Sequence, residues 1–433
     1  MFPQWIIEKK RDGTSLTEEE IGFFMRGYAA GAIPDYQMAA LAMAIAIRGM
    51  TLEETCFLTK CMIASGIVLD TSSIHQPKID KHSTGGIGDK ISLVLAPLVA
   101  SCGVTVPMIA GRGLGITGGT LDKLESIPGY RANLEEEEFL RVIAECGCSI
   151  TGATGRIAPA DSKLYALRDV TGTVPSIPLI VASILSKKVA AGLDGLVFDV
   201  KMGKGAFMKT MESANNLANT LVEVSRLSGL PSNAFITDMN QPLGHAVGNT
   251  VEVIETVEAL QGKGPPDIIE LILAIGAKML LMAGIDATPE AACQRLTGKI
   301  NSGEAFERFK LMVRLQGGDS NCLDQPDKLG KALVNVQLEA EESGYVQEAD
   351  AGLIGRASVA LGAGRNRLED KIDHSAGITG LKKIGDRVER GEPLACIYAN
   401  SEERLATAKP FVRQAFTIGA ESAKLPKLVV AEI

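Results

Sequence analysis

The sequence predicts a mixed α/β fold: a small all-helical domain, a larger α/β domain around a central, mostly parallel sheet, and a C-terminal α+β cap of the barrel-sandwich type. The N-terminal part has helical periodicity, the middle alternates short apolar runs with glycine turns and helical stretches, and the C-terminal part has short strands at regular spacing. A chain of 433 residues is long enough for about three domains. We place the helical domain at 1–66 and 163–193, the α/β domain at 67–162 and 194–335, and the cap at 343–433.

Composition excludes several classes of protein. Hydrophobic residues make up 46% and charged residues 22%, which is typical of a chain that folds. A net charge of −8 argues against binding to nucleic acid or to an anionic membrane surface. The first residues lack the features of a secretory signal, so we expect a cytoplasmic protein. The eight cysteines have no paired metal-ligand spacing, and we expect buried thiols rather than a zinc site.

The first 66 residues predict helices. Capping signals, in which a hydroxyl and a carboxylate satisfy the first backbone amides of a helix, occur at Ser15–Glu18 and Thr51–Glu54. The segment Met38–Ile47 is apolar nearly all round, so it belongs at the centre of a bundle or against another subunit. We expect a homodimer formed through this domain.

The middle of the chain predicts parallel strands joined by helices. Strands are expected from Ile79, at Cys148–Gly152 and at Gly195–Lys201. The uncharged stretch from Ile91 to Gly111 predicts a buried helix and a buried strand rather than a membrane span, because prolines interrupt it. Two helical stretches broken at Pro175 and Pro178 lie further on, the second resuming at Leu179.

The C-terminal cap contains the glycine hairpin GDRVERGEPL, which resembles the hairpin of biotinyl and lipoyl carrier domains. No acceptor lysine stands in the Met-Lys-Met turn of such carriers, so we expect a structural cap and not a swinging arm. Residues 317–342 are expected to form a linker and a helix.

The densest polar motif runs from Asp80 to Asp89, after a strand and before a helix. It combines a cation at Lys81, an imidazole at His82, the Ser83 hydroxyl and three glycines. Such a loop at a helix N-terminus suits a phosphate, because backbone amides converge there and the lysine neutralises charge. The alternative is a glycine turn with incidental polar residues.

A second glycine loop runs from Ala110 to Thr120. It contains a formal GxGxxG pattern, but no convincing acidic residue follows where a dinucleotide site needs one. We therefore expect it to form the second wall of one anion pocket, with the Thr120 hydroxyl donating to the anion.

A third group of polar residues lies on the two helical stretches around the proline break. Ser183 and Lys187 are four residues apart and share one helix face, while Tyr165 and Arg168 lie on the preceding helix. Two cations and a hydroxyl match the carbonyls and ring N–H of a planar heterocycle. The alternative is a solvated basic face, since Lys163 and Lys188 lie nearby.

Four motifs in this order resemble the pyrimidine-nucleoside phosphorylases, which include thymidine phosphorylase: KHSTGGIGDK, GRGLGITGGTLDKLESIPG, KLYALRDVTGTVPSIPLIVASILSKK and DVKMGKGAFM. The resemblance covers essentially the whole chain. It implies reversible phosphorolysis of a pyrimidine nucleoside, thymidine-type preferred, to the free base and a pentose 1-phosphate. It also implies a homodimer, a cleft between the helical and α/β domains, and no cofactor beyond the co-substrate phosphate.

The resemblance also implies roles for individual residues. His82, Arg168 and Lys187 take the catalytic roles. The phosphate set comprises Lys81, Ser83, Ser92, Met108, Ala110 and Thr120, and the substrate set comprises Tyr165, Arg168, Ser183 and Lys187.

The chain departs from the family pattern at three positions. Ala110 replaces a serine, which deletes one hydroxyl expected on phosphate, and Ile116 replaces a loop histidine near the sugar. Some bacterial members hold potassium where this chain has Lys90, whose ammonium is expected to pair with Glu255 and to take the place of the cation. Met108, where broader-specificity members carry lysine, favours 2′-deoxyribose over ribose.

Two further readings compete with the phosphorylase. One is a phosphoribosyltransferase related to the anthranilate enzyme, which shares the two-domain architecture but lacks the full C-terminal cap. The other is a binding protein whose pocket was eroded at Ala110 and Ile116. The joint presence of Lys81, His82 and Arg168 opposes it, because a pocket without catalysis has no need for so much desolvated charge.

Overall fold

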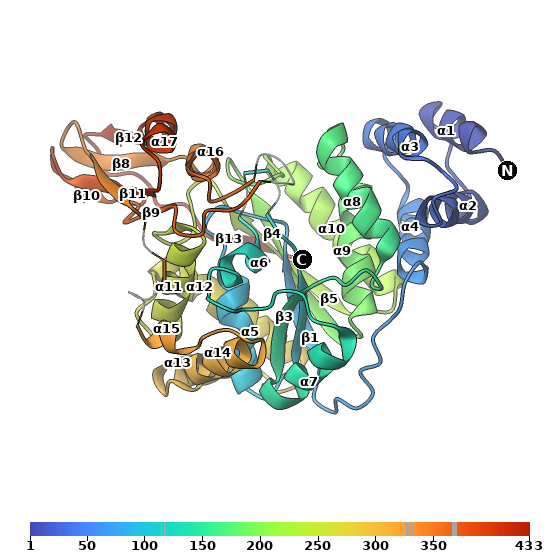
Figure 1. Cartoon of the computed structure of the whole chain (residues 1–433), viewed down its shortest axis with the longest axis horizontal. Helices are drawn as coiled ribbons and strands as arrows, with labels where there is room; N and C mark the ends of the chain where they lie inside the picture. The colour runs from blue at the N-terminus through green and yellow to red at the C-terminus, as the bar shows by residue number, and fades with distance from the viewer. Residues whose placement is uncertain (114, 117, 326–328, 331, 366–369) are drawn as a thin grey trace.

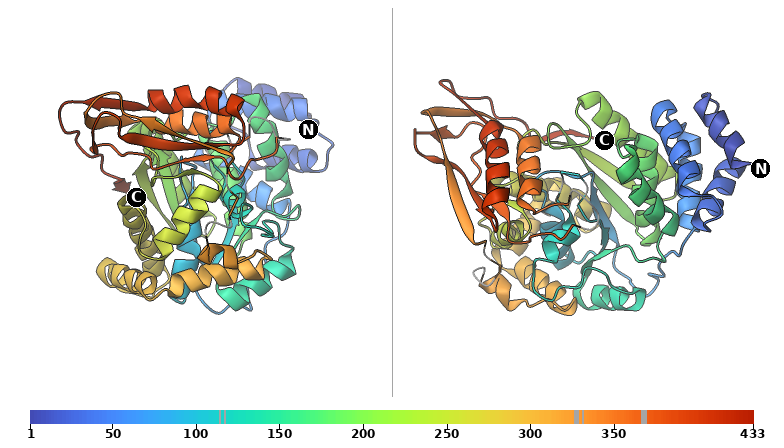
Figure 2. Two further views of the ribbon diagram at one scale, coloured as in Figure 1. Left: turned by 60° about the vertical axis from the view of Figure 1, so that its left-hand side comes forward. Right: turned by 45° about the horizontal axis from the view of Figure 1, so that its top comes forward.

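The computed structural model describes residues 1–113, 115–116, 118–325, 329–330, 332–365 and 370–433. Its helical N-terminal part and its C-terminal cap lie at opposite ends of the molecule, with the central sheet and its helices between them (Figure 1 and Figure 2, right). The predicted mixed α/β class with a helical domain is confirmed. No helix in the described part of the chain is long and apolar enough to cross a membrane.

The helical domain joins segments that are far apart in the sequence. Its helices are α1 (Pro3–Arg11), α2 (Glu18–Ala29), α3 (Asp35–Arg48), α4 (Leu52–Ala64), α8 (Pro159–Thr171) and α9 (Ile177–Ala190). Helix α4 packs against α9, and α2 and α3 pack against α8. The capping box expected at Thr51–Glu54 is present, but that of α2 lies at Thr17–Glu20 and not at Ser15–Glu18. Thr17 takes the cap because it too has a glutamate three residues later.

Helix α9 begins two residues before the predicted Leu179. Pro178 lies in its first turn, where the missing backbone N–H costs no helical hydrogen bond. The proline break therefore shortens the connection between α8 and α9 without moving Ser183 and Lys187 off the helix.

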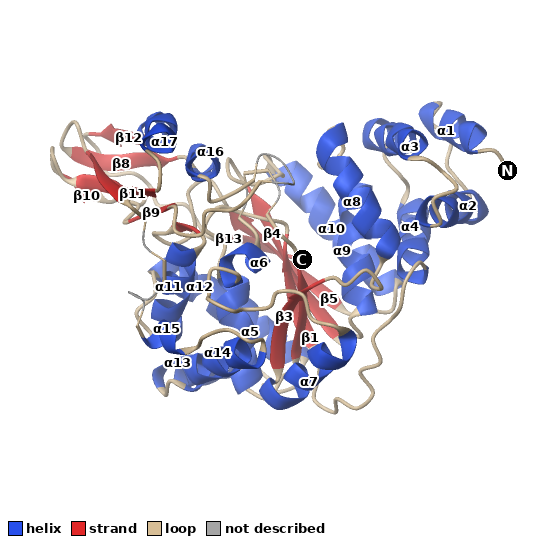
Figure 3. Cartoon of the chain, in the orientation of Figure 1, coloured by secondary structure: helices blue, strands red, loops and turns tan. Residues whose placement is uncertain are grey.

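The central sheet has the order β1-β4-β5-β13, and Figure 3 shows its strands in red with helices around them. Its strands are β1 (Ile79–Ser83), β4 (Gly195–Met202), β5 (Ser232–Asp238) and β13 (Val429–Glu432). The first three are parallel, and β13 runs antiparallel to β5 although the predicted cap extended to residue 433. An edge strand has unpaired backbone groups that accept another strand, which gives β13 its place. A separate parallel pair is formed by β2 (Val106–Ala110) and β3 (Cys148–Gly152).

Helices surround these strands. They are α5 (Ile91–Ser101), α6 (Thr120–Leu124), α7 (Glu136–Cys146), α10 (Met211–Leu227), α11 (Thr250–Leu260), α12 (Pro266–Met282), α13 (Pro289–Asn301), α14 (Glu304–Leu315) and α15 (Asn321–Asp324). Every residue of α5 is buried, and β2 follows it. The expectation of a buried helix and a buried strand in this uncharged stretch is confirmed.

The cap contains two sheets, β10-β8-β12 and β6-β9-β11-β7, with two helices beside them (Figure 2). Its elements are β6 (Val247–Gly248), β7 (Val334–Glu339), β8 (Gly344–Ala349), β9 (Gly377–Thr379), β10 (Arg387–Val388), β11 (Pro393–Ala399), β12 (Phe416–Gly419), α16 (Ala351–Leu361) and α17 (Glu402–Ala415). Strand β6 comes from the α/β segment, so backbone hydrogen bonds join the cap to it.

Candidate active site

The phosphate motif begins on the edge strand of the central sheet. Lys81, His82 and Ser83 lie on β1 itself and pair with Val197–Asp199 of β4, so only the residues from Thr84 onward form the loop before α5. The sequence placed the whole motif after the strand, and this is wrong. Pairing with the buried strand β4 extends β1 through these polar residues despite their low strand propensity.

Carboxylates hold the Lys81 ammonium and the Ser83 hydroxyl of this motif. Lys81 is fully buried, and its Nζ lies 3.4 Å from Oδ2 of Asp199 and 3.8 Å from Oδ1 of Asp89. The Ser83 hydroxyl donates to Oδ2 of Asp89 at 2.5 Å. That hydroxyl has to leave Asp89 before it donates to a bound anion.

The remaining predicted phosphate residues come from three elements. Ser92 lies in the first turn of α5, Met108 and Ala110 lie on β2, and Thr120 is the first residue of α6. Ser92 and Met108 are buried, whereas Ala110 and Thr120 are partly exposed. Access to solvent at the last two positions is what a ligand from solution needs.

The second glycine loop folds tightly in front of α6. A side chain on Gly119 would collide with the backbone N of Gly113, so this position requires glycine. Leu114 and Thr117 lie outside the described residues. Ile116 packs against the main hydrophobic core beside Gly355 of α16, so its side chain serves packing with the cap.

Arg168 organises the proline break and keeps donors free. Its guanidinium donates through Nε to the carbonyl of Thr173 (3.4 Å), through Nη1 to Leu179 (3.0 Å) and through Nη2 to Val174 (2.6 Å). A guanidinium has five N–H groups, and described residues accept from three of them, so among the described part of the chain two remain for a ligand. Burial lowers the pKa of Arg168 to about 10, which still leaves it cationic at neutral pH.

Lys187 has all three of its N–H donors engaged. Its ammonium pairs with Asp161 and donates to the backbone O (2.5 Å) and the Oγ (3.1 Å) of Ser183. A ligand carbonyl must therefore replace one of these acceptors. Tyr165 is 38% exposed, and its ring centroid lies 6.0 Å from the Lys187 Nζ. Burial raises the pKa of Tyr165 to about 12, so its hydroxyl is a donor at neutral pH.

Asp161 was not predicted from the sequence. It precedes Tyr165 by four residues and Arg168 by seven on α8, so it shares their helix face, and this spacing is the signal that could have found it. Its Oδ1 is buried without a hydrogen-bond partner in the described part of the chain. Asp161 holds the Lys187 ammonium beside Ser183.

One buried ion pair joins helix α9, which carries Ser183 and Lys187, to strand β1, which carries Lys81 and His82. Lys188 of α9 donates to Oδ2 of Asp80 on β1 at 2.5 Å and to the carbonyl of Ile109 on β2 at 2.9 Å. Burial and the charges of Lys188, Lys187 and Lys81 lower the pKa of His82 well below its usual value. The imidazole of His82 is therefore neutral at neutral pH. The cations that lower its pKa lie on α9 (Lys187 and Lys188) and on β1 (Lys81).

Further buried charged side chains lie on β4, which pairs with β1, and on α6. Asp199 and Lys201 are two residues apart on β4, and Lys123 of α6 pairs with Glu252 (2.8 Å) and donates to the carbonyl of Asp89 (2.7 Å). From the sequence, only a strand at Gly195–Lys201 was expected here, without these charge pairs. The alternation of Asp199 and Lys201 on one strand face was the signal for a polar end.

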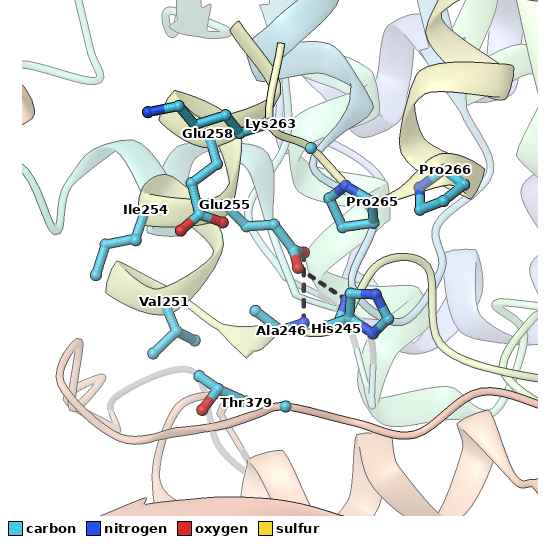
Figure 4. A pocket seen from close by; sticks show the side chains of 12 residues that line it. His245, Ala246, Val251, Ile254, Glu255, Glu258, Lys263, Pro265, Pro266 and Thr379 are labelled. Carbon is cyan, nitrogen blue, oxygen red and sulfur yellow. Dashed lines mark hydrogen bonds between the residues drawn. The ribbon is translucent and has the colours of Figure 1, made fainter. Parts of the chain in front are cut away.

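Lys90 occupies a position at which carbonyl oxygens converge. Its ammonium donates to the carbonyls of Leu243 (3.1 Å) and Ala246 (3.0 Å) and pairs with Glu255. Burial by itself lowers the pKa of Lys90, but the charges of Glu255, Glu252 and Asp267 and the hydrogen bond to Glu255 together outweigh it, and the pKa is raised overall. Glu255 also accepts from the backbone N of His245 (2.8 Å) and of Ala246 (3.3 Å), as Figure 4 shows.

Two observations bear on cofactors and ligands. In the described ranges, no group of three or more His, Cys, Asp and Glu side chains is arranged to hold a metal ion. A cavity of about 450 Å³ lies between α11, the turn 262–266 and the end of β9 (Figure 4). None of the predicted phosphate or pyrimidine residues lines this cavity, which lies beside Glu255 instead.

Three family models match the chain. The description "Glycosyl transferase family, helical bundle domain" matches residues 4–66, "Glycosyl transferase family, a/b domain" matches 75–306, and "Pyrimidine nucleoside phosphorylase C-terminal domain" matches 345–419. The second of these alone spans more than half of the chain.

Curated relatives match over nearly their whole length. The chain is 52% identical over 397 residues to a pyrimidine-nucleoside phosphorylase of Staphylococcus haemolyticus strain JCSC1435, covering 92% of each sequence. It is 51% identical over 398 residues to that of Staphylococcus aureus strain USA300, again covering 92% of each. Among solved structures, anthranilate phosphoribosyltransferase from Thermus thermophilus matches with a TM-score of 0.60 and 19% identity, over 72% of this chain and 99% of that one. This last likeness concerns the fold alone.

Proposed function

The chain belongs to the pyrimidine-nucleoside phosphorylase family of glycosyl transferases, and we propose that it catalyses the reversible phosphorolysis of pyrimidine nucleosides. The products are the free base and a pentose 1-phosphate. The observation that carries the proposal is the contact of Lys188 with Asp80, because it joins the helix of Ser183 and Lys187 to the strand of Lys81 and His82. The predicted donors for the two ligands therefore lie on two elements that are in direct contact.

The pyrimidine end of the site works by stabilising a leaving anion. As the glycosidic bond breaks, the base gains negative charge on its carbonyl oxygens. The two free N–H groups of Arg168 and the ammonium of Lys187 are donors for these oxygens. When Lys187 turns from Ser183 to a base carbonyl, the Ser183 hydroxyl is released to accept the ring N–H. Donors aimed at charge that develops in the transition state accelerate the reaction.

The phosphate end supplies the nucleophile. Lys81 brings a buried ammonium, and Ser83, Ser92 and Thr120 bring hydroxyls. Holding phosphate against the anomeric carbon removes much of the entropic barrier to the attack. The neutral imidazole of His82 donates one N–H toward the base, and as a neutral group it does not oppose the cationic character of the sugar.

The test is release of free base from thymidine, deoxyuridine and uridine, each with and without inorganic phosphate, followed by ultraviolet absorbance. Phosphate-dependent release, fastest for thymidine, is expected. The preference for the deoxy sugar is taken from the family resemblance, in which broader-specificity members carry lysine at the position of Met108. Release that does not depend on phosphate, or no release from any of the three, would overturn the proposal.

The chain needs no added cofactor and no potassium. Lys90 supports this, because its ammonium already fills the carbonyl and carboxylate ligands at which the family's potassium would bind. A second cation beside a buried ammonium is repelled. The residues present therefore do not fit a potassium ion, and no step of the reaction is assigned to one.

The active form is a homodimer built through the helical domain. Helix α3 supports this assignment with an exposed apolar stripe of Tyr36, Ala40, Met43 and Ile47, spaced by four, three and four residues. Tyr36 is 75% exposed and Ile47 72%. A stripe of this kind on one helix face is typical of a surface that another chain covers.

A further inference from the structure

Four charged side chains are buried together behind the end of β1. The side chains of Lys81, Lys201 and Asp199 are fully buried, and that of Asp89 is 6% exposed. The Lys201 Nζ lies 2.7 Å from Oδ2 of Asp199, and the Lys81 Nζ lies 3.4 Å from the same oxygen. Two lysines thus compete for one carboxylate oxygen.

The two carboxylates are not equivalent. Asp89 accepts from the Ser83 hydroxyl (2.5 Å) and from the backbone N of Ile91 (3.3 Å), so it has partners besides the lysines. Asp199 accepts from the Thr237 hydroxyl through Oδ1, which leaves Oδ2 for the ammonium groups. The competition between Lys201 and Lys81 for Oδ2 of Asp199 therefore decides how strongly this carboxylate holds the Lys81 ammonium.

The Lys81 ammonium is poised for a further acceptor. The Lys81 Nζ makes no hydrogen bond to any described residue, whereas the Lys201 Nζ lies 2.7 Å from Oδ2 of Asp199. A buried ammonium without an acceptor is costly unless a ligand oxygen provides one. Asp199 lies nearer to Lys201 than to Lys81, so Lys201 takes most of its attraction.

We propose that Lys201 is a positioning residue for the phosphate site: it neutralises Asp199, and the Lys81 ammonium is thereby left available to a phosphate oxygen. The inference rests on the proposed phosphorolysis, in which Lys81 binds phosphate. Without Lys201, the Asp199 carboxylate draws Lys81 into a closed ion pair and repels the phosphate. Lys201 acts through Asp199 and Lys81 and does not touch the substrate.

The proposal makes predictions of opposite sign for two neighbouring residues. K201M is expected to raise the phosphate KM by about tenfold or more, because Asp199 then competes with phosphate for Lys81. D199N is expected to lower it, because both lysines lose that competitor. The double variant D199N/K201M restores the charge balance and is expected to stay within about threefold of wild type. The nucleoside KM is expected to change little in all three.

The matched control is K204M. Lys204 is three residues further along the chain and partly exposed, and it pairs with Glu348 and Asp350. Its removal deletes the same charge from the protein surface and is expected to leave both KM values unchanged. Isothermal titration with inorganic phosphate alone repeats the comparison without the nucleoside.

A merely structural role for Lys201 predicts a different pattern. Damage to packing would raise the phosphate KM in both K201M and D199N, raise the nucleoside KM as well, and leave the double variant no better than either. Any of these results overturns the proposal, as does a K201M variant with wild-type phosphate KM. If K201M does not fold, D199N and D199N/K201M decide the question by themselves.

Failure of the inference is distinct from failure of the proposed function. If the wild-type protein releases no base with phosphate, the proposed function fails. If it does, and the single variants do not shift the phosphate KM in opposite directions, only the role of Lys201 fails.

Discussion

Lys188 and Asp80 form a buried ion pair between α9 and β1, with Lys188 Nζ 2.5 Å from Oδ2 of Asp80. Lys187, the next residue back on α9, belongs to the predicted pyrimidine set, and Lys81, the next residue on β1, belongs to the phosphate set. The backbone N of Lys81 also donates to Oδ1 of Asp80 at 2.7 Å. One carboxylate therefore ties both parts of the candidate active site together.

Breaking this pair is expected to cost stability. K188M leaves Asp80 as an uncompensated buried charge, and its free energy of unfolding in urea should fall by about 3–5 kcal/mol. The double variant D80N/K188M should recover part of the loss. The control is R11A, which removes the exposed pair of Arg11 with Asp12 and should cost much less, because solvent screens that pair. Equal losses of unfolding free energy for K188M and R11A would contradict the prediction that the buried Lys188–Asp80 pair stabilises the fold.

Replacing Lys90 should create a requirement for potassium. K90T removes the ammonium and leaves the carbonyls of Leu243 and Ala246 with the Glu255 carboxylate, which are oxygen ligands for a monovalent cation. We expect wild-type activity to be the same in sodium and potassium buffers and K90T activity to be higher in potassium. Strong potassium dependence of wild-type activity would refute the proposal that the Lys90 ammonium takes the place of a potassium ion.

Restoring the family hydroxyl at Ala110 should tighten phosphate binding. Ala110 is partly exposed at the end of β2, opposite Gly152, so a serine fits there. Because a hydrogen bond to a charged group contributes about 1.5–3 kcal/mol, A110S should lower the phosphate KM by about tenfold. The nucleoside KM should not change. An unchanged phosphate KM would place the Ala110 side chain away from the anion.

Acidification should destabilise the protein through His82. Its pKa is lowered in the folded state, so the unfolded chain binds more protons, and stability is lost as the pH falls below about 6.5 toward the folded value. The melting temperature of the wild type should therefore fall more between pH 7 and pH 5 than that of H82N. The control is H75N, which removes an exposed histidine and should keep the pH dependence of the wild type. Parallel curves for wild type and H82N would exclude this effect.

A charge on the exposed stripe of α3 should dissociate the homodimer. Ile47 is 72% exposed in the single chain, and I47D would place a carboxylate in the proposed interface. Sedimentation velocity should report a dimer for the wild type and a monomer for I47D. L333D, at a position 84% exposed in the cap, should remain a dimer. A wild-type monomer would disprove the proposed assembly.

The cytoplasmic location stays a prediction from the sequence.

Local patterns predicted the helices and strands around the site well. Strand β3 has the predicted bounds Cys148–Gly152, and β4 begins at the predicted Gly195, because a short apolar run between glycines is a strong local signal. The polar strand end at Lys81–Ser83 was missed, since only pairing with β4 makes it a strand. Boundaries at α2 and α9 shifted by two residues, where more than one local capping or breaking signal was present.

For the candidate site, the sequence predicted the residues that carry the chemistry, and the structure was needed to find their partners. Residue types, motif order and the family resemblance predicted the cations and hydroxyls of the candidate site, and these assignments stay predictions. The partners of these groups were not visible in the sequence. Asp161 lies 26 residues from Lys187, and Asp80 lies 108 residues from Lys188.

The sequence by itself determined the mixed α/β class and the family, and it predicted which chemical groups bind phosphate and pyrimidine. These depend on composition, periodicity and motif order, which are local properties of the chain. The tertiary structure alone decided which buried carboxylate neutralises which lysine: Asp161 for Lys187, Asp80 for Lys188, and Asp199 shared between Lys201 and Lys81. Such pairings depend on strand register and helix packing, because a buried charge is stabilised only by the partner that the fold places within a few ångströms of it.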